Sequence, residues 1–377
     1  MKYYCSGCGK EYSDKELIWR CSCGAYLSCK SEEVLRKEDV IKDRFSLWRY
    51  EKVLPLTLEE VSATFMEGFT PMVKISWNGM EMYFKMDYLM PTGSFKDRGS
   101  AVMINFLKKL GIKRVIDDSS GNAGSSIAAY CTAANMDCDV FVPTSTSQGK
   151  LVQISLYGAK VHQILGSREN VAIEAMKASE ASKDVFYASH NWHPLFIEGT
   201  KTVAYEVWEQ LGWRVPDNVI APFGGGSVIL GMYKGCKELL KAGEVTKIPK
   251  LFPIQAKNCA PLYDLYNGGS GEVKVSHTVA EGIALANPLR RMEAIEVVRE
   301  TGGSVEAVTE AEIVKALCQA ASLGFYIEPT SATALAGANR LIASGAILPG
   351  EITVIVLTGN GLKSTDKIGK ITGIVKD

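Results

Sequence analysis

Short apolar runs alternate with helical segments along most of the chain, and this alternation restricts the possible folds more than any other feature. Four runs each precede a segment whose apolar residues have helical spacing: RVIDD (114–118), CDVFVP (138–143), AKVHQIL (159–165) and NVIAPF (218–223). A fifth run, TVIVL (353–357), precedes a glycine-rich loop. Parallel strands need long crossover connections, usually helices, so this order predicts an α/β protein with parallel sheets and helices on their faces.

Length and charge narrow the class of protein further. A chain of 377 residues is too long for one small core and suits two lobes with a small appendage. The 42 basic residues (Lys and Arg) equal the 42 acidic ones, which disfavours binding to nucleic acid or to an anionic membrane. The start, MKYYCSGCGK, lacks the apolar core of a signal peptide, and no apolar run approaches the roughly 20 residues of a membrane span. We therefore expect a cytoplasmic protein.

Five of the ten cysteines lie within the first 29 residues and have the spacing of a metal site. Cys5 and Cys8 form one pair, Cys21 and Cys23 form a second, and a glycine follows each pair. Tetrahedral zinc takes four thiolates from two tight turns, and four sulfur ligands leave no open position for catalysis. We predict a structural zinc site, in which Cys29 is an alternative ligand; free thiols are the other interpretation. The remaining cysteines are expected in the core: Cys131, Cys138, Cys236, Cys259 and Cys318.

A charged segment, KSEEVLRKEDVIKD (30–43), follows these cysteines and is expected to be a helical connector. Further on, PTGSFKDRGS (91–100) lies between a predicted strand, MEMYFKMDYL (80–89), and a predicted helix. Ser94 and Asp97 have the spacing of a capping box, which places Lys96 in the first helical turn. The helix dipole there opposes a positive charge and favours the neutral amine that a nucleophilic lysine needs. The alternative is a solvated surface lysine.

Three glycine-rich loops each follow an apolar run: SSGNAGSS (119–126), FGGGS (223–227) and TGNG (358–361). Ligands of parallel sheets bind beyond the carboxyl ends of the strands, and such loops present backbone N–H groups to anions. Each loop alone has a simpler interpretation as a tight turn. Together with Lys96 they indicate an anionic ligand joined covalently to an amine, and pyridoxal 5′-phosphate fits this description.

The chain resembles the threonine synthase family, within the tryptophan-synthase-β-like (fold type II) pyridoxal-phosphate enzymes. The motifs that carry the resemblance are SLWRYEKVLP (46–55), PTGSFKDRG (91–99), SSGNAGSSIAAY (119–130), GKLVQISLYGA (149–159), EGTKTVAYEV (198–207), EPTSATALA (328–336) and LTGNGLK (357–363). The resemblance implies a homodimer and three parts of the chain. Residues 1–30 are a zinc-ribbon-like segment, the N-terminal ribbon; 31–106 with 206–377 anchor the cofactor; 107–205 form a small domain with the SSGN loop.

The resemblance also implies roles for individual residues. Lys96 corresponds to the lysine that binds the cofactor covalently, Asn122 to the donor for its phenolic oxygen, and Thr358 to the hydroxyl facing its pyridine nitrogen. A neutral hydroxyl does not hold that nitrogen protonated, which suits elimination or replacement better than transamination. The phosphate is expected on Gly224, Gly225, Gly226 and Ser227. The substrate α-carboxylate is expected on Ser119, Ser120 and the N–H of Ala123. His190 and Asn191, in the segment before Phe196, are further candidates for substrate binding, although the histidine has an alternative interpretation as a polar packing residue.

One position departs from the family pattern. Phe196 stands where related enzymes have an arginine that binds the substrate phosphate, and losing a bidentate phosphate ligand is not a conservative change. Either another cation replaces it (Lys96, Lys201 or Arg98), or the substrate differs. The leading expectation is conversion of O-phosphohomoserine and water to threonine and phosphate. The alternatives are a related β-eliminating or β-replacing enzyme, such as a threonine/serine dehydratase, and a non-enzymatic binding protein.

Overall fold

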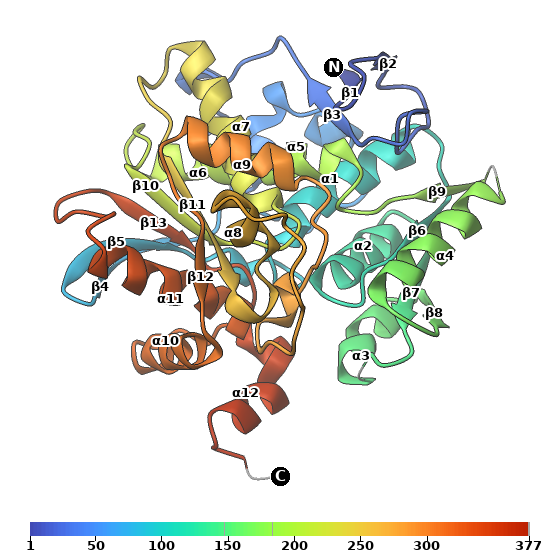
Figure 1. Cartoon of the computed structure of the whole chain (residues 1–377). Coiled ribbons are helices and arrows are strands. Elements are labelled where there is room, and N and C mark those ends of the chain that lie inside the picture. The colour runs from blue at the N-terminus through green and yellow to red at the C-terminus, as the bar shows by residue number, and fades with distance from the viewer. Residues whose placement is uncertain (147, 183, 376–377) are drawn as a thin grey trace. The chain divides into compact units, whose positions relative to one another are not determined.

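The computed structural model describes residues 1–146, 148–182 and 184–375, and the chain divides into two compact units. The first unit contains Met1–Gly68 and Lys96–Thr202, and the second contains Phe69–Phe95 and Val203–Asp377. Each unit has a β-sheet covered by helices (Figure 1), so the predicted α/β class is confirmed.

The first unit contains a parallel four-stranded sheet in the order β8-β7-β6-β9. Its strands are β6 (Arg114–Asp117), β7 (Asp137–Pro143), β8 (Lys160–Ile164) and β9 (Val185–Tyr187). The helices of this unit are α1 (Lys96–Lys109), α2 (Asn122–Ala133), α3 (Gln148–Leu156), α4 (Arg168–Glu180) and α5 (Pro194–Thr200). Helices α2, α3 and α4 connect successive strands, as the alternating sequence pattern predicts.

The N-terminal ribbon forms a separate antiparallel sheet in the order β2-β1-β3, with β1 (Lys2–Cys5), β2 (Glu11–Ser13) and β3 (Leu27–Lys30). The connector (30–43) contains one 3-10 turn, η1 (Lys37–Asp39), and two more 3-10 turns follow it, η2 (Leu47–Val53) and η3 (Leu58–Glu60). The predicted connector helix is therefore wrong. Its buried residues, Leu35 and Val40, are five positions apart, a spacing that does not place two side chains on one helical face.

The second unit contains a six-stranded sheet in the order β12-β11-β10-β13-β5-β4. The strands are β4 (Met72–Trp77), β5 (Met80–Lys85), β10 (Asn218–Pro222), β11 (Lys250–Ala256), β12 (Glu306–Val308) and β13 (Thr353–Val356). The sheet is mixed rather than fully parallel, which corrects the prediction of two parallel sheets. Asn78 and Gly79, both with positive φ, form a two-residue hairpin that turns β4 antiparallel to β5.

Helices cover the sheet of the second unit: α6 (Thr202–Gln210), α7 (Ser227–Ala242), α8 (Pro261–Tyr266), α9 (Arg291–Glu300), α10 (Glu310–Ser322), α11 (Pro329–Ala343) and α12 (Thr365–Ile371). Short 3-10 turns occur at η4 (Asp87–Leu89), η5 (Lys257–Cys259), η6 (Glu281–Ile283) and η7 (Gly361–Ser364). Every residue of β10 and β13 is buried, as expected for a sheet covered on both faces.

The cysteines outside the ribbon are mostly in the core, as predicted. Four of them are buried: Cys131, Cys138, Cys236 and Cys259. Cys318 is exposed, which corrects its assignment to the core. Within the described residues, none of the helices has the length and apolarity needed to cross a membrane.

Candidate functional site

In the first unit, the SSGN loop (119–122) and His190 lie at the same edge of the sheet. The loop follows β6 and His190 follows β9, and these two strands are parallel neighbours. The Ser189 hydroxyl donates to the Asp118 carboxylate (3.1 Å), and His190 Nδ1 lies 4.0 Å from Asp117 Oδ1. The strand order reverses at β6, so this edge is a topological switch point, where ligands of open α/β sheets bind. The predicted substrate residues Ser119, Ser120, Ala123, His190 and Asn191 therefore come together in this unit.

Lys96 is the first residue of α1, so it lies in the first helical turn as predicted. Its side chain is partly buried. The pKa of Lys96 is lowered from 10.5 to about 7, chiefly because burial disfavours the charged amine. The positive charge of Arg168 lowers this pKa further, and the negative charge of Asp117 acts in the opposite direction. A substantial fraction of the amine is therefore neutral near pH 7, which is the nucleophilic form.

The predicted capping box in front of Lys96 is wrong. Ser94 Oγ is buried without a hydrogen-bond partner among the described residues. The Asp97 carboxylate instead accepts a hydrogen bond from the Ser126 hydroxyl of α2 (2.6 Å). Because α1 begins only at Lys96, Ser94 precedes the capping position by one residue, and Asp97 connects two helices instead of closing one end.

Phe196, the residue that departs from the family pattern, lies beside Lys96. The Lys96 Nζ is 5.6 Å from the centre of the Phe196 ring, and the ring also contacts His190 edge to face, at 5.6 Å between centroids. Phe196 is fully buried, and a Cβ added to Gly99 of α1 would come within 2.5 Å of its ring. The aromatic ring therefore fills the space against α1 and contributes no charge to this part of the site.

Two of the cations considered as replacements for the missing arginine are engaged in the interior. Lys201 Nζ lies 2.7 Å from the Glu198 carboxylate and donates to the Val53 carbonyl (3.0 Å). Arg98 donates to the Thr202 hydroxyl (3.0 Å). Both cationic side chains are fully buried, which argues against either as the ligand of a substrate phosphate.

Arg168 and Asp117 are the charged residues of this region that sequence reasoning missed. Arg168 begins α4, directly after β8 and at the carboxyl edge of the same sheet, and its charge lowers the pKa of both Lys96 and His190. Burial is the largest cause of the low His190 pKa, so the imidazole is neutral at pH 7. Burial and the neighbouring Asp118 raise the pKa of Asp117 well above its ordinary value. The signal for Arg168 was a charge just beyond the predicted strand 159–165, and the signal for Asp117 was a charge at the end of the predicted strand 114–118.

In the second unit, the FGGGS loop connects β10 to α7. Gly226 has φ +89° and caps α7, and a Cβ at Gly226 would lie 2.8 Å from the Phe223 ring. A Cβ at Gly224 would lie 3.1 Å from the Cα of Ile283. The first N–H groups of a helix lack partners within the helix and carry its positive dipole end, so Gly224, Gly225, Gly226 and Ser227 form a site that suits a phosphate.

Thr358 follows β13, the parallel neighbour of β10, and is held by Ser331 of α11. The Ser331 hydroxyl oxygen lies 3.2 Å from Thr358 Oγ1 and accepts from the N–H groups of Thr358 (3.0 Å) and Gly359 (2.8 Å). The N–H of Phe95, the residue before Lys96 in the chain, donates to the Thr358 carbonyl (3.0 Å). Ser331 was missed as a supporting residue, although the EPTSATALA motif contains it.

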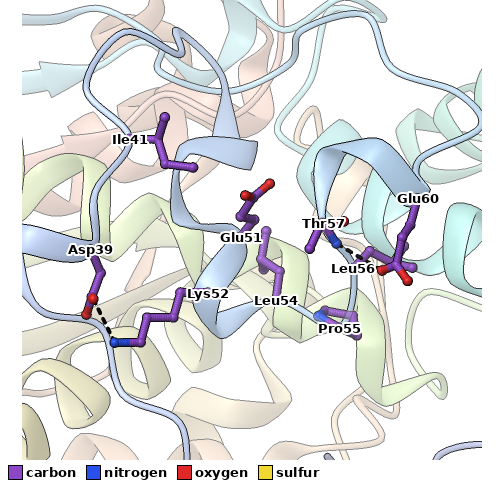
Figure 2. A pocket seen from close by; sticks show the side chains of 9 residues that line it. All are labelled: Asp39, Ile41, Glu51, Lys52, Leu54, Pro55, Leu56, Thr57 and Glu60. Atoms are coloured by element: carbon purple, nitrogen blue, oxygen red, sulfur yellow. Dashed lines mark hydrogen bonds and ion pairs between the residues drawn. The ribbon is translucent and has the colours of Figure 1, made fainter.

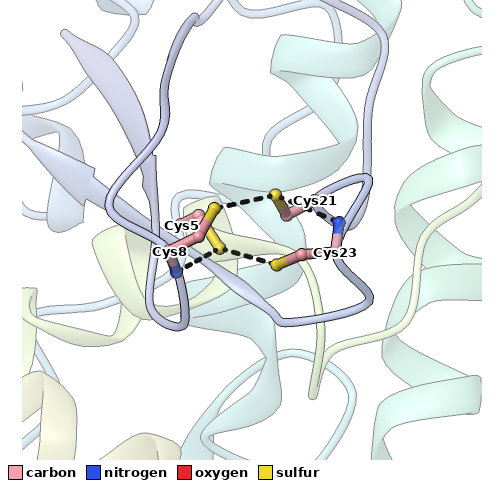
Figure 3. Close-up of side chains that lie close together, drawn as sticks. All are labelled: Cys5, Cys8, Cys21 and Cys23. Atoms are coloured by element: carbon pink, nitrogen blue, oxygen red, sulfur yellow. Dashed lines mark hydrogen bonds between the residues drawn. The ribbon is translucent and has the colours of Figure 1, made fainter.

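The four predicted metal ligands meet in the N-terminal ribbon. The Sγ atoms of Cys5, Cys8, Cys21 and Cys23 all lie within 4.8 Å of one another and face a common centre (Figure 3). Cys29 lies on β3 and is outside this group. The Tyr12 hydroxyl is 3.0 Å from Cys21 Sγ. Four sulfur atoms from two turns match the ligand set of a structural zinc ion.

A further depression is lined by residues between Asp39 and Glu60, none of which is a predicted site residue (Figure 2). Its volume is about 380 Å³, and its lining residues are Asp39, Ile41, Glu51, Lys52, Leu54, Pro55, Leu56, Thr57 and Glu60. Its acidic side chains are paired with Lys52, Arg44 and Lys109, each at 2.6 Å. The depression therefore offers no unpaired charge for a ligand.

Known proteins resemble this chain along most of its length. A family described as "Pyridoxal-phosphate dependent enzyme" matches residues 63–359. A threonine synthase of Methanocaldococcus jannaschii is 35% identical, covering 97% of this chain and 94% of that protein. A threonine synthase of Methanosarcina acetivorans is 33% identical, covering 97% of this chain and 92% of that protein. The solved structure of threonine deaminase isoform 2 from Solanum lycopersicum has a TM-score of 0.69 at 21% identity, covering 92% of this chain and 91% of that one.

Proposed function

Because the chain belongs to the threonine synthases of the pyridoxal-phosphate-dependent enzyme family, we propose that it converts O-phosphohomoserine and water to threonine and phosphate. The observation that carries the proposal is 35% identity to a threonine synthase over 97% of the chain. Resemblance of fold alone does not decide the substrate, because a threonine deaminase has the same fold.

The proposed cofactor residues are those that the resemblance to the family implies. Lys96 would bind the aldehyde of pyridoxal phosphate, Asn122 would donate to its phenolic oxygen, and Thr358 would interact with its pyridine nitrogen. Gly224, Gly225, Gly226 and Ser227 would hold its phosphate. The support is the low pKa of Lys96, the tight glycine loop at the start of α7, and the hydrogen bonds by which Ser331 fixes Thr358. The bound cofactor supplies the electron-withdrawing ring that the reaction needs.

The chain's own residues then position the substrate and move its protons. Ser119, Ser120 and the N–H of Ala123 bind the α-carboxylate. The Lys96 amine, when neutral, would take a proton from one substrate carbon and, when protonated, would return it to another. A pKa of about 7 lets the same amine act as base and as acid near neutral pH.

We further propose that Arg168 binds the phosphate of the substrate in place of the missing arginine. It lies at the same sheet edge as His190 and the SSGN loop, and its guanidinium suits bidentate phosphate binding. The neutral His190 imidazole and the Asn191 amide add hydrogen-bond donors without a charge. Phe196 fills the space beside Lys96.

The test is to incubate the purified enzyme with O-phosphohomoserine and, separately, with threonine. We expect phosphate and threonine in equal amounts from the first mixture and little 2-oxobutanoate from the second. The uncharged Phe196 favours one alternative, a threonine/serine dehydratase or another enzyme acting on a β-activated amino acid. Reaction only in the second mixture would establish that alternative.

Three further features stay proposals. The first is a zinc ion on Cys5, Cys8, Cys21 and Cys23, supported by the closeness of their sulfur atoms and tested by metal analysis of the purified protein. The second is a cytoplasmic homodimer, which light scattering after gel filtration and fractionation of cells would test. The third is the domain organisation, in which residues 31–106 and 206–377 anchor the cofactor and residues 107–205 form a small domain with the SSGN loop.

A further inference from the structure

The N-terminal ribbon packs directly on the turn that contains His190 (residues 188–193, the 188–193 turn). Trp19, between the two cysteine pairs, contacts Tyr187 edge to face at 4.8 Å and Trp192 at 5.3 Å. Tyr187 is the last residue of β9, and Trp192 lies within the turn. The segment between the cysteine pairs therefore covers both ends of the stretch that carries His190.

A second contact joins the ribbon to the helix that carries Phe196. Tyr3 of β1 lies edge to face with His193, at 6.2 Å between ring centroids. His193 caps α5, because its Nδ1 accepts a hydrogen bond from the Leu195 N–H (3.3 Å). The hydrophobic core that contains Tyr3 also contains Phe196, together with Cys5 and Cys21. Displacement of β1 would therefore disturb the residue that lies against Lys96.

A third contact reaches α4, the helix that Arg168 begins. Arg20 forms an ion pair with Glu180 at the other end of α4, and its guanidinium lies 4.5 Å from the Trp19 ring. This exposed ion pair contributes little stability by itself. Arg20 therefore contacts both Trp19 and α4.

The 188–193 turn depends on such packing because it is not part of a regular element. The N–H groups of Trp192 and His193 both bond to the Ser189 carbonyl, at 3.1 and 2.9 Å. The ribbon has strands of only three or four residues, and its buried residues belong to the hydrophobic core that also contains Phe196. A small appendage with little core of its own commonly takes its shape from a structural metal.

We propose that the metal ion held by Cys5, Cys8, Cys21 and Cys23 fixes the 188–193 turn through Trp19 and Tyr3, and so controls binding of the substrate's distal group without taking part in the chemistry. The inference rests on the proposed function for its kinetic effect. Its structural part, the coupling of the metal to the turn, is independent of the substrate.

The structural part is tested by hydrogen exchange on the full-length holoenzyme, with zinc and after its removal by a chelator. Metal loss should raise the exchange rates of the Trp192 and His193 amides on the order of tenfold or more, and should leave the amides of β10 unchanged. Unchanged exchange in the turn of the zinc-free protein would overturn the proposal, even if the enzyme has no threonine synthase activity.

The kinetic part compares three variants. Cys8→Ser removes an exposed ligand, Trp19→Leu keeps all four ligands but removes the aromatic contacts, and Cys318→Ser is the exposed cysteine control. We expect the first two to raise the KM for O-phosphohomoserine on the order of tenfold with a smaller change in kcat, because a displaced turn misplaces substrate-binding groups. Zinc content should fall only in Cys8→Ser. The absorbance of the bound cofactor checks that each variant is folded. A normal KM for Trp19→Leu with zinc bound would refute the coupling.

Discussion

Lys96 has a lowered pKa and lies at the start of a helix, so replacement of its side chain should abolish activity. We predict that Lys96→Ala abolishes turnover and covalent attachment of pyridoxal phosphate, because no other amine takes part in the proposed chemistry. Activity and the borohydride-reducible absorbance of the cofactor measure both effects. Lys108→Ala on the same helix is the matched control and should be normal. Normal turnover by Lys96→Ala would refute the proposed role of Lys96 in the reaction.

The lowered pKa of Lys96 also predicts how cofactor uptake depends on pH. Only the neutral amine attacks the aldehyde, so uptake by the cofactor-free enzyme should rise with pH and level off, with a midpoint near 7 rather than near the ordinary 10.5. Arg168 lowers this pKa, so Arg168→Gln should move the midpoint to higher pH. Stopped-flow absorbance at a series of pH values measures both midpoints. A wild-type midpoint near 10 would contradict the burial of the amine.

Arg168 should also affect substrate binding. Hydrogen bonds to charged groups contribute about 1.5–3 kcal/mol, so Arg168→Gln should raise the KM for O-phosphohomoserine by about 10- to 100-fold. Lys177→Gln, an exposed lysine on the same helix, is the control for a simple change of net charge. Equal KM values for the two variants would show that another group binds the phosphate.

At the scale of elements, the two ends of α7 allow a comparison between two glycines with positive φ. Gly226 caps the start at φ +89° and is crowded by the Phe223 ring, whereas Gly243 caps the end at φ +77° with no atom near its absent Cβ. Alanine at either position should destabilise the protein by about 1–3 kcal/mol because of backbone strain. Only Gly226→Ala should also weaken pyridoxal phosphate binding, measured by titration of the cofactor-free enzyme. Equal affinities of the two variants for pyridoxal phosphate would show that the FGGGS loop does not bind the phosphate of the cofactor.

At the scale of the whole molecule, the sequence predicts where strands and helices occur better than it predicts which of them lie side by side. The apolar run 218–223 became the fully buried strand β10, because a strand covered on both faces is largely apolar. The position of Arg168 beside Lys96 and His190 was not predictable, because it depends on the strand order β8-β7-β6-β9. The connector, by contrast, failed as a helix because its buried residues Leu35 and Val40 do not have helical spacing.

A buried ion pair in the second unit shows what such distant contacts contribute. Lys85 of β5 and Glu206 of α6 are 121 residues apart in sequence, fully buried, and 2.6 Å apart. Glu206 also accepts from the N–H groups of Phe69 (2.7 Å) and Thr70 (3.2 Å), so its carboxylate holds the chain where the second unit begins. The pair therefore connects a strand, a helix and a loop.

Removal of one partner should cost far more than removal of both. We predict that Lys85→Met lowers the free energy of unfolding by about 3–5 kcal/mol, because it leaves the Glu206 charge buried without its cation. The double variant Lys85→Met/Glu206→Leu should recover part of that loss, although the N–H groups of Phe69 and Thr70 then lack their acceptor. Denaturant unfolding of the cofactor-free protein measures the free energy of unfolding of each single variant, Lys85→Met and Glu206→Leu, and of the double variant. Additive losses in the double variant would show that the two side chains act independently, and that this ion pair does not hold the unit together.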